Sequence, residues 1–239
     1  MVRFLLAAGV MSVCAQALAE APAQFEVVEQ FAARLSAGNL LRLRGVLSTD
    51  VVLVEHEAFV SVMAGQQVDA RLRAWIAEGA RLEVSFEFAS ADGAMIVTQE
   101  EMWLEGMPEQ LLPLRSTGVY VVDGGRVRSV TRLLEGGQRD ALMRDAIVGD
   151  WLTGGYVFSY HADGAYAIAQ WGRPWDGGEF TIEGGVVRVV SDERSEFCEA
   201  GEVGLWSLSF AGPDRHTIVR IEDVCAAREG PTIVLRRME

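Results

Sequence analysis

Two periods of hydrophobic residues organise the first part of the chain. From residue 25 to residue 47, apolar residues recur at spacings of three and four, which is the spacing of a buried helical face. Gly38 interrupts this pattern where one helix can stop, and Asn39 can cap the next. The same spacing returns in residues 65–79, with the apolar positions Val68, Leu72, Trp75 and Ile76. We therefore expect three amphipathic helices.

Strands are predicted between and after these helices. Residues 51–55 form a short apolar run between the second and third helix. In residues 81–88, apolar residues alternate with polar and charged ones, so one face of a sheet is buried and the other faces water. Three more strand patterns follow, at residues 94–106, 111–122 and 126–134. Helices followed by long antiparallel strands predict an α+β fold for this part.

A different pattern begins after residue 146. Residues 136–146 start with a Gly pair and continue with a short helical pattern, which indicates a linker. Beyond it, short strand patterns are separated by turns at regular spacing, which is typical of an antiparallel barrel or sandwich. The sequence therefore predicts two domains, at residues 22–135 and 147–239, and the second is all β.

Two stretches of the first part resemble a known superfamily. SAGNLLRLRGVLSTDVVLVEH, at residues 36–56, ends the first helix and leads into the first strand, and VYVVDGGRVRSV, at residues 119–130, forms the closing hairpin. They resemble the nuclear transport factor 2-like superfamily, and its SnoaL-like branch in particular. The resemblance implies a cone, in which three helices lie on a bent antiparallel sheet around an apolar pocket. Members include ketosteroid isomerases, polyketide cyclases and epoxide hydrolases, while others only bind or assemble, so the fold alone does not give the activity.

Glu55, His56 and Glu57 end the first apolar strand and are the first candidate site. By the resemblance, Glu55 falls where the steroid isomerases carry their carboxylate general base. A base there needs a donor that stabilises the developing oxyanion. The corresponding donor positions hold Phe31, which cannot donate, and Thr117, a neutral and weaker donor. We therefore favour a solvated strand end for Glu55.

Acid–base chemistry stays open as the alternative, with Glu55 assisted by His56 or by Glu101 from a later strand. Neighbouring side chains on a strand point to opposite faces, so Glu55 and Glu57 share one face and His56 lies on the other. The three side chains therefore do not form one cluster. Metal sites commonly take three or four convergent ligands, and His161 and His216 lie in the second part. We expect no metal site and no cofactor.

Aromatic and sulfur-containing side chains would line the apolar pocket of the cone. The ligand-binding candidates are Phe31, Trp75, Phe86, Met102 and Trp103. Methionine adapts to irregular ligands, although such residues also fill ordinary cores. Alternation sends Glu101 and Trp103 to one face of their strand and Glu100 and Met102 to the other, so one carboxylate could project into the cone.

The opening of the second part resembles the lipocalin-like (calycin) barrels. It reads IVGDWL at residues 147–152 and continues as GYVFSYHADGAYAIA. In those barrels a Gly-x-Trp plugs the floor and a late arginine packs over the indole. Gly149 and Trp151 match the first element, and Arg236 or its neighbour Arg237 in the final strand supplies the second. Small eight-stranded barrels either hold one small ligand or fill with side chains, and the sequence leaves both open.

The first residues have the anatomy of a secretory signal. Arg3 precedes an apolar stretch that ends in Ala17-Leu18-Ala19. Small residues before the cleavage point predict a signal peptide over residues 1–19 and a mature start at Glu20. Cys14 as a lipoprotein anchor is the alternative. The sequence thus predicts a periplasmic or secreted protein.

Charge and cysteine count narrow the partners. A net charge of −13 and a pI near 4.7 disfavour nucleic acid and anionic membrane surfaces. The apolar run of the signal is too short for a stable membrane anchor. Export leaves Cys198 and Cys225 as an even pair in a compartment that permits disulfides, so we expect them to bond to each other.

Two function hypotheses follow from these patterns. The favoured one is an exported protein that binds a small apolar molecule or an envelope partner without catalysis. The alternative is a SnoaL-like enzyme of the isomerase, cyclase or hydrolase type with Glu55 as its base. Converging polar groups with shifted pKa values around the pocket favour the enzyme, and an apolar lining favours binding. A homodimer through the exposed sheet face stays open.

Overall fold

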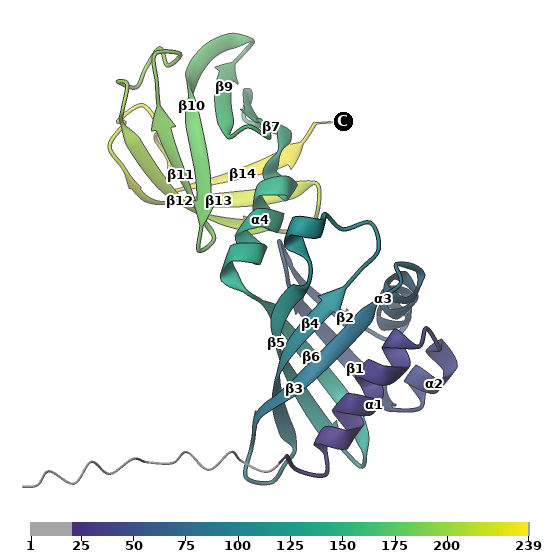
Figure 1. The fold of residues 1–239 in the computed structure, drawn as a ribbon. Helices are drawn as coiled ribbons and strands as arrows, with labels where there is room; N and C mark the ends of the chain where they lie inside the picture. Colours follow the sequence, from purple (N-terminus) through teal and green to yellow (C-terminus); the bar gives the residue numbers. More distant parts are fainter. Residues whose placement is uncertain (1–20, 239) are drawn as a thin grey trace, which may run out of the picture.

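The structure is a computed structural model, and it describes residues 21–238. The expected signal peptide, its cleavage before Glu20 and the alternative anchor at Cys14 lie outside the described residues. The described chain builds two hydrophobic cores, one from residues 25–134 and one mainly from residues 143–235. Figure 1 shows a layer of helices on a sheet at one end of the molecule and a barrel at the other.

Three helices cover one face of the first part, as the apolar spacing predicts (Figure 1): α1 (Phe25–Ser36), α2 (Leu40–Arg44) and α3 (Gln66–Ala77). The Asn39 side chain accepts a hydrogen bond from the backbone N–H of Arg42 at 3.0 Å, which confirms it as the cap of α2. The buried face of α1 follows the helical spacing, with Phe25, Val28, Phe31, Ala32 and Leu35. This packing stabilises α1, because an isolated helix of its length is marginal in water.

The sheet of the first part has six strands in the order β2-β1-β6-β5-β4-β3. Its strands are β1 (Leu47–His56), β2 (Val60–Ala64), β3 (Arg81–Ala89), β4 (Met95–Trp103), β5 (Leu114–Asp123) and β6 (Arg126–Leu134), with the short 3-10 helix η1 (Glu109–Leu111) between β4 and β5. The antiparallel prediction is wrong at one place, since β1 and β6 pair in parallel. The cause is the chain order: the meander from β3 to β6 starts at the far edge and ends beside β1.

The hairpin partner of β1 is missing from the sequence prediction. β2 pairs antiparallel with β1 at the edge of the sheet. Its side chains alternate only between exposed and half-buried, and Val60 and Val62 are exposed. A strand without a buried face lacks the alternation that a sequence pattern can detect.

The second part is a closed barrel of eight strands in the order β10-β11-β12-β13-β14-β7-β8-β9. These are β7 (Gly149–Thr153), β8 (Tyr156–Tyr160), β9 (Ala165–Gln170), β10 (Arg173–Glu183), β11 (Val186–Ser191), β12 (Val203–Phe210), β13 (Arg215–Asp223) and β14 (Thr232–Arg237). Each strand pairs antiparallel with its neighbours in the chain, and β14 closes the barrel on β7. The prediction of an all-β second part is confirmed, and its form is the barrel.

The expected linker forms a helix that contacts both parts and ends in the barrel core. Residues Gly136–Ile147 form α4, and its Met143 and Ile147 are fully buried in the barrel core. The Asp140 carboxylate accepts hydrogen bonds from the backbone N–H groups of Gly184 and Gly185 at 2.7 and 3.0 Å, which fastens α4 to the turn after β10. The short helical pattern of the expected linker is therefore a helix whose apolar residues pack into a core.

The turn between β1 and β2 reaches the barrel. Ala58 is buried in the barrel core, and the Phe59 ring lies 6.2 Å from that of Phe210. The Nε of Arg139 in α4 also donates to the Glu57 carbonyl at 3.4 Å. Both parts therefore share packing at this turn. Among residues 21–238, no helix has the length and apolar character needed to cross a membrane.

Candidate functional site

Glu55 lies inside the first part, not at a solvated strand end. Its side chain is buried, and Arg71 from α3 donates to its Oε2 at 2.9 Å. The same guanidinium reaches Glu57 Oε1 at 3.3 Å. The favoured interpretation of a solvated end is wrong. Buried and half-buried side chains alternate along the later part of β1 up to its end, and this alternation turns Glu55 inward, beside buried Arg132 on β6.

One oxygen of the Glu55 carboxylate, Oε1, is buried without a hydrogen-bond partner among the described residues. Burial raises the pKa of Glu55, and the charge of Glu57 adds to this against the opposing effect of Arg71. A carboxyl group with a raised pKa and an oxygen to spare is suited to carrying a proton.

A second buried carboxylate, Glu100 on β4, is fully engaged. Arg132 Nε donates to Glu100 Oε2 at 2.7 Å, the Ser116 hydroxyl donates to the same oxygen at 2.9 Å, and the Tyr120 hydroxyl donates to Oε1. Burial raises the pKa of Tyr120 well above its usual value, with the Glu100 charge as the next cause, so this hydroxyl stays protonated. A carboxylate with both oxygens satisfied is the arrangement of a structural ion pair.

The two other catalytic candidates face away from this cluster. Glu101 follows Glu100 in β4, so its side chain lies on the opposite face, where it pairs with exposed Arg115 at 3.1 Å. His56 follows Glu55 in β1 and is half-buried on that opposite face. The structure therefore brings neither His56 nor Glu101 to Glu55. Alternation separates the two faces correctly, but it does not tell which of two adjacent glutamates is the buried one.

The expected lining residues of the cone do not form one wall. Three of them are core residues with almost no exposure: Phe31, Trp75 and Met102. Phe86 is half-buried, with its ring 5.5 Å from that of Phe25. Trp103 follows Met102 in β4 and faces the other way, under the guanidinium of Arg81 at 3.9 Å. Met102 and Trp103 therefore cannot line the same pocket.

The floor of the barrel is built by Trp151 and Arg237. Trp151 is fully buried, and its indole N–H donates to the Ile147 carbonyl at 2.6 Å. The guanidinium carbon of Arg237 lies 4.3 Å from the centre of this indole, and its Nη1 and Nη2 donate to the carbonyls of Val148 and Ala146. The arginine thus covers the indole and satisfies carbonyl groups at the end of α4.

The arginine over the indole is Arg237, which corrects the choice of Arg236. The register pairs Arg237 with Trp151, and it pairs Arg236 with Leu152 on the outward face. Gly149 permits the close approach, because its φ is +126° and a Cβ atom there would lie 2.8 Å from Arg237 Nη1.

His216 lies between this floor and the barrel interior. It is fully buried on β13, with its ring centre 4.2 Å from that of Trp151. Neither ring nitrogen has a hydrogen-bond partner in the described part of the chain. Burial, and after it the charge of Arg237, lower the pKa of His216 to about 3. The imidazole is therefore neutral at pH 7 and acts as one more ring of the apolar floor.

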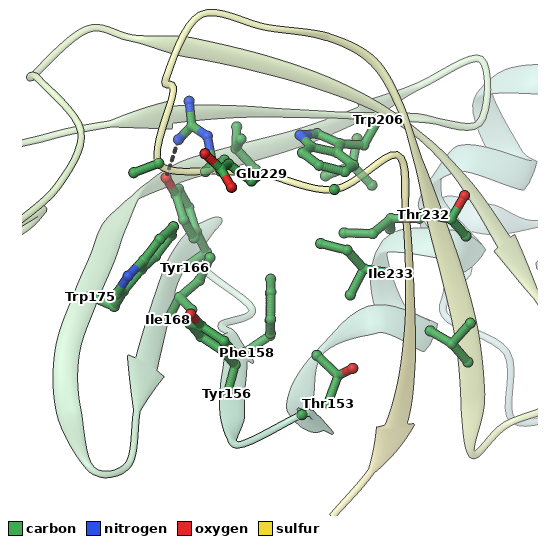
Figure 2. Close-up of a pocket in the computed structure, with 18 of the residues that line it drawn as sticks. Thr153, Tyr156, Phe158, Tyr166, Ile168, Trp175, Trp206, Glu229, Thr232 and Ile233 are labelled. Atoms are coloured by element: carbon green, nitrogen blue, oxygen red, sulfur yellow. Dashed lines mark hydrogen bonds between the residues drawn. The ribbon is translucent and has the colours of Figure 1, made fainter.

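Above the floor, the barrel encloses a cavity of about 460 Å³. All eight strands contribute to its lining, and Figure 2 shows side chains arranged around an open centre. The larger lining side chains are Tyr156, Phe158, Tyr160, Tyr166, Ile168, Trp175, Trp206, Ile218 and Ile233. The cavity is therefore aromatic and aliphatic on most of its surface.

A buried polar cluster forms one wall of the cavity. Arg228 Nε donates to both oxygens of Asp223, at 3.0 and 2.9 Å, and Arg228 Nη1 donates to Asp176 Oδ2 at 3.0 Å. The hydroxyl of Tyr166 donates to Asp176 Oδ2 at 2.9 Å, and the indole N–H of Trp206 donates to Asp223 Oδ2 at 2.9 Å. The two carboxylates thus hold the arginine and two aromatic cavity walls in place.

The disulfide fastens the loop that carries this arginine. The prediction that Cys198 bonds to Cys225 is confirmed. The backbone N–H of Arg228 donates to the Cys225 carbonyl at 3.2 Å. On the other side of the bridge, the Phe197 ring lies 5.6 Å from that of cavity-lining Trp175. The bridge therefore links two loops that both support the cavity wall.

Sequence reasoning missed the polar cluster entirely. Its members come from four strands and one loop: Tyr166, Asp176, Ser191, Asp223 and Arg228. No two of them belong to one local motif, so no spacing in the sequence marks them. In the structure β10 begins at Arg173, before the strand pattern EFTIEG, so Asp176 lies inside a strand that the sequence pattern did not reach.

Comparisons with known proteins give likenesses of fold only. No protein-family model matches the chain. No protein of curated function matches it either.

Solved structures do resemble the chain. An NTF2-like protein of unknown function from Cytophaga hutchinsonii is 12% identical, over 47% of this chain and 89% of its own, with a TM-score of 0.39. An LEH-like epoxide hydrolase from M. tuberculosis is 23% identical, over 51% of this chain and 90% of its own, with a TM-score of 0.37. A protein with a ketosteroid isomerase-like fold from Catenulispora acidiphila, in complex with trimethylamine, is 18% identical, over 49% and 92%, with a TM-score of 0.39. No conclusion about activity rests on likenesses at this level.

Proposed function

We propose that this chain is an exported, non-catalytic protein that binds a small apolar molecule inside its barrel. The observation that carries the proposal is the cavity of about 460 Å³ with its aromatic and aliphatic lining. Sites for small ligands typically measure about 300 to 1,000 Å³ and are lined mainly by such side chains. The lipocalin-like resemblance of the barrel opening supports the same function.

The barrel is built in a way that keeps this cavity open. Tyr166 and Trp206 are held by hydrogen bonds to Asp176 and Asp223, so neither ring is free to fold into the space. Closure of the barrel between β14 and β7 leaves no free edge through which the sheet could flatten. An apolar ligand inside would gain roughly 25 cal/mol for each Å² that it removes from water.

Export is supported by the chemistry of the chain. A disulfide between Cys198 and Cys225 persists in oxidising compartments and is rare in a reducing cytosol. The signal-like first residues point the same way.

Titration with the neutral fluorescent probe N-phenyl-1-naphthylamine tests the proposal. We expect saturable binding of one probe per chain and loss of binding in Val189→Trp, which fills the cavity from β11. Val219→Trp is the matched control, because Val219 is exposed on the outside of β13. Equal binding by both variants, or no saturable binding by the parent protein, would contradict the proposal.

Acid–base chemistry at Glu55 is the second candidate, and one observation favours it. The carboxylate has a raised pKa and a buried oxygen without a partner in the described residues. Turnover of an enolisable ketone that falls by roughly 100-fold in Glu55→Gln would support this function. Equal turnover by parent and variant removes it.

A further inference from the structure

We infer that the barrel cavity selects ligands whose polar end is a positively charged nitrogen, and that it disfavours carboxylates. This inference rests on the proposed binding function and names the chemical class of its ligand. The reason lies in the charged groups of the cavity lining: some are already paired within the protein, and others are free to meet a ligand.

Arg228 is the one cationic side chain in the cavity lining, and it is already neutralised. It forms ion pairs with Asp176 at 3.0 Å and with Asp223 at 2.9 Å. Its Nη1 also donates to Ser191 Oγ at 2.7 Å, and its Nη2 donates to the Glu202 carbonyl at 3.4 Å. Two carboxylates against one guanidinium leave this wall with a net negative charge, so an anionic head meets repulsion there.

Glu229 is the charged lining group that has no neutralising partner. Its side chain is exposed and also lines the cavity, which places its carboxylate at the mouth. Within residues 21–238 it takes part in no ion pair at 4.0 Å or less. Figure 2 shows Glu229 on the same side of the cavity as Tyr166 and Trp206. A ligand that enters with an ammonium group at the mouth therefore finds a carboxylate available to it.

The aromatic lining adds a second attraction of the same sign. Tyr156 and Trp175 both line the cavity, and their rings meet edge to face at 5.7 Å. Aromatic faces attract cations through their negative π surface and give no such attraction to an anion. The net charge of −13 on the whole chain acts in the same direction at longer range.

Three ligands share the same kind of hydrophobic body and differ in the charge of their polar end at pH 7. They are the cation 4-phenylbutylamine, the neutral 4-phenylbutanol and the anion 4-phenylbutyrate. Each is titrated against the N-phenyl-1-naphthylamine complex of the full chain at pH 7. We expect the amine to displace the probe at the lowest concentration and the acid at the highest, with a ratio of about tenfold or more between them. Salt should narrow this ratio, because the mouth is open to solvent.

A substitution at the mouth identifies the group responsible. Glu229→Gln should weaken the amine about threefold to tenfold and leave the alcohol unchanged. Glu222→Gln is the matched control, because Glu222 is exposed on β13 and lies outside the cavity lining. It should leave all three ligands unchanged.

The results distinguish the charge selectivity of the cavity from the binding function itself. Equal affinity for the three ligands, a preference for the acid, or failure of the amine to displace a bound probe overturns the charge selectivity and leaves the binding function standing. An unchanged amine affinity in Glu229→Gln also overturns the assignment. Absence of saturable probe binding by the parent protein overturns both the selectivity and the proposed function.

Discussion

The indole N–H of Trp206 donates to Asp223 Oδ2 at 2.9 Å, so one wall of the cavity is held by the carboxylate that also binds Arg228. This bond joins the apolar lining to the buried ion pairs. The carboxylates therefore give the cavity its shape, and the aromatic rings give it its surface. Removing a charge from this cluster should affect both stability and ligand binding.

Arg228→Met tests that dependence. The substitution leaves Asp176 and Asp223 buried without their cation, and we expect it to lower the free energy of unfolding by about 3 to 5 kcal/mol. Adding Asp176→Asn and Asp223→Asn to Arg228→Met should restore part of the loss, because the buried charges are then gone. Urea unfolding measures each variant. Arg188→Met, on the exposed face of β11, is the control and should change the value by about 0.5 kcal/mol or less. An Arg228→Met protein as stable as this control contradicts the account.

Gly118→Ala tests the buried ion pair of the first part. A Cβ atom on Gly118 would overlap the Glu100 carboxylate and lie 2.7 Å from Thr98 Oγ1. Overpacking of this kind typically costs about 1 to 3 kcal/mol. Thermal unfolding should show the loss. Gly136→Ala, which meets open space in α4, should be neutral or stabilising. Equal stability of the two variants would show that Glu100 moves freely.

His216 should make the barrel lose stability in acid. Its folded pKa of about 3 lies below the ordinary value of 6.5, so the fold favours the neutral ring. As the pH falls from 6.5 towards 3, the unfolded chain takes up a proton that the folded chain does not, and stability falls by at most about 1.4 kcal/mol for each pH unit. His216→Phe should lessen this fall between pH 6.5 and 4.5 in urea unfolding. His161→Phe, at an exposed position, should keep the parent slope, and a His216→Phe slope equal to it refutes the account.

Glu55 should affect the pH dependence of stability in the opposite direction to His216, and Glu55→Gln should remove this effect. Burial raises the folded pKa of Glu55 above 4.5, so the charge that Glu55 gains on deprotonation is disfavoured in the folded state. The parent protein therefore loses stability as the pH rises from 4.5 through the folded pKa, and the Gln variant does not. The free energy of unfolding of Glu55→Gln, relative to that of the parent protein, should therefore increase as the pH rises. A difference that is constant with pH would show that Glu55 is solvated after all.

The apolar patterns were the informative part of the sequence. The helical faces around Phe31 and Trp75, the barrel floor at Trp151 and the cysteine pair all follow from spacing, resemblance or compartment. The edge strand β2 could not be predicted in this way. Val60 and Val62 are exposed, and the residues between and after them are only half-buried or exposed, so no buried face marks the strand.

The candidate site was much harder to predict. Glu55 on β1 is buried beside Arg71, which approaches from helix α3, whereas a strand pattern that ends in Glu suggests a polar, solvated end. The Arg228 cluster depends on barrel closure, which brings Asp176 and Asp223 together from distant strands. Long-range pairing decides both cases, and a single sequence carries no local signal of it.

The indole N–H resonances of the six tryptophans test the location of the ligand most directly. Trp175 and Trp206 line the barrel cavity, whereas Trp75 lies in the core of the first part and Trp103 on its sheet. On addition of N-phenyl-1-naphthylamine to the full chain, we expect the Trp175 and Trp206 resonances to shift in a saturable way while those of Trp75 and Trp103 stay in place. A saturable shift of Trp75 or Trp103 with Trp175 and Trp206 unchanged would contradict binding in the barrel.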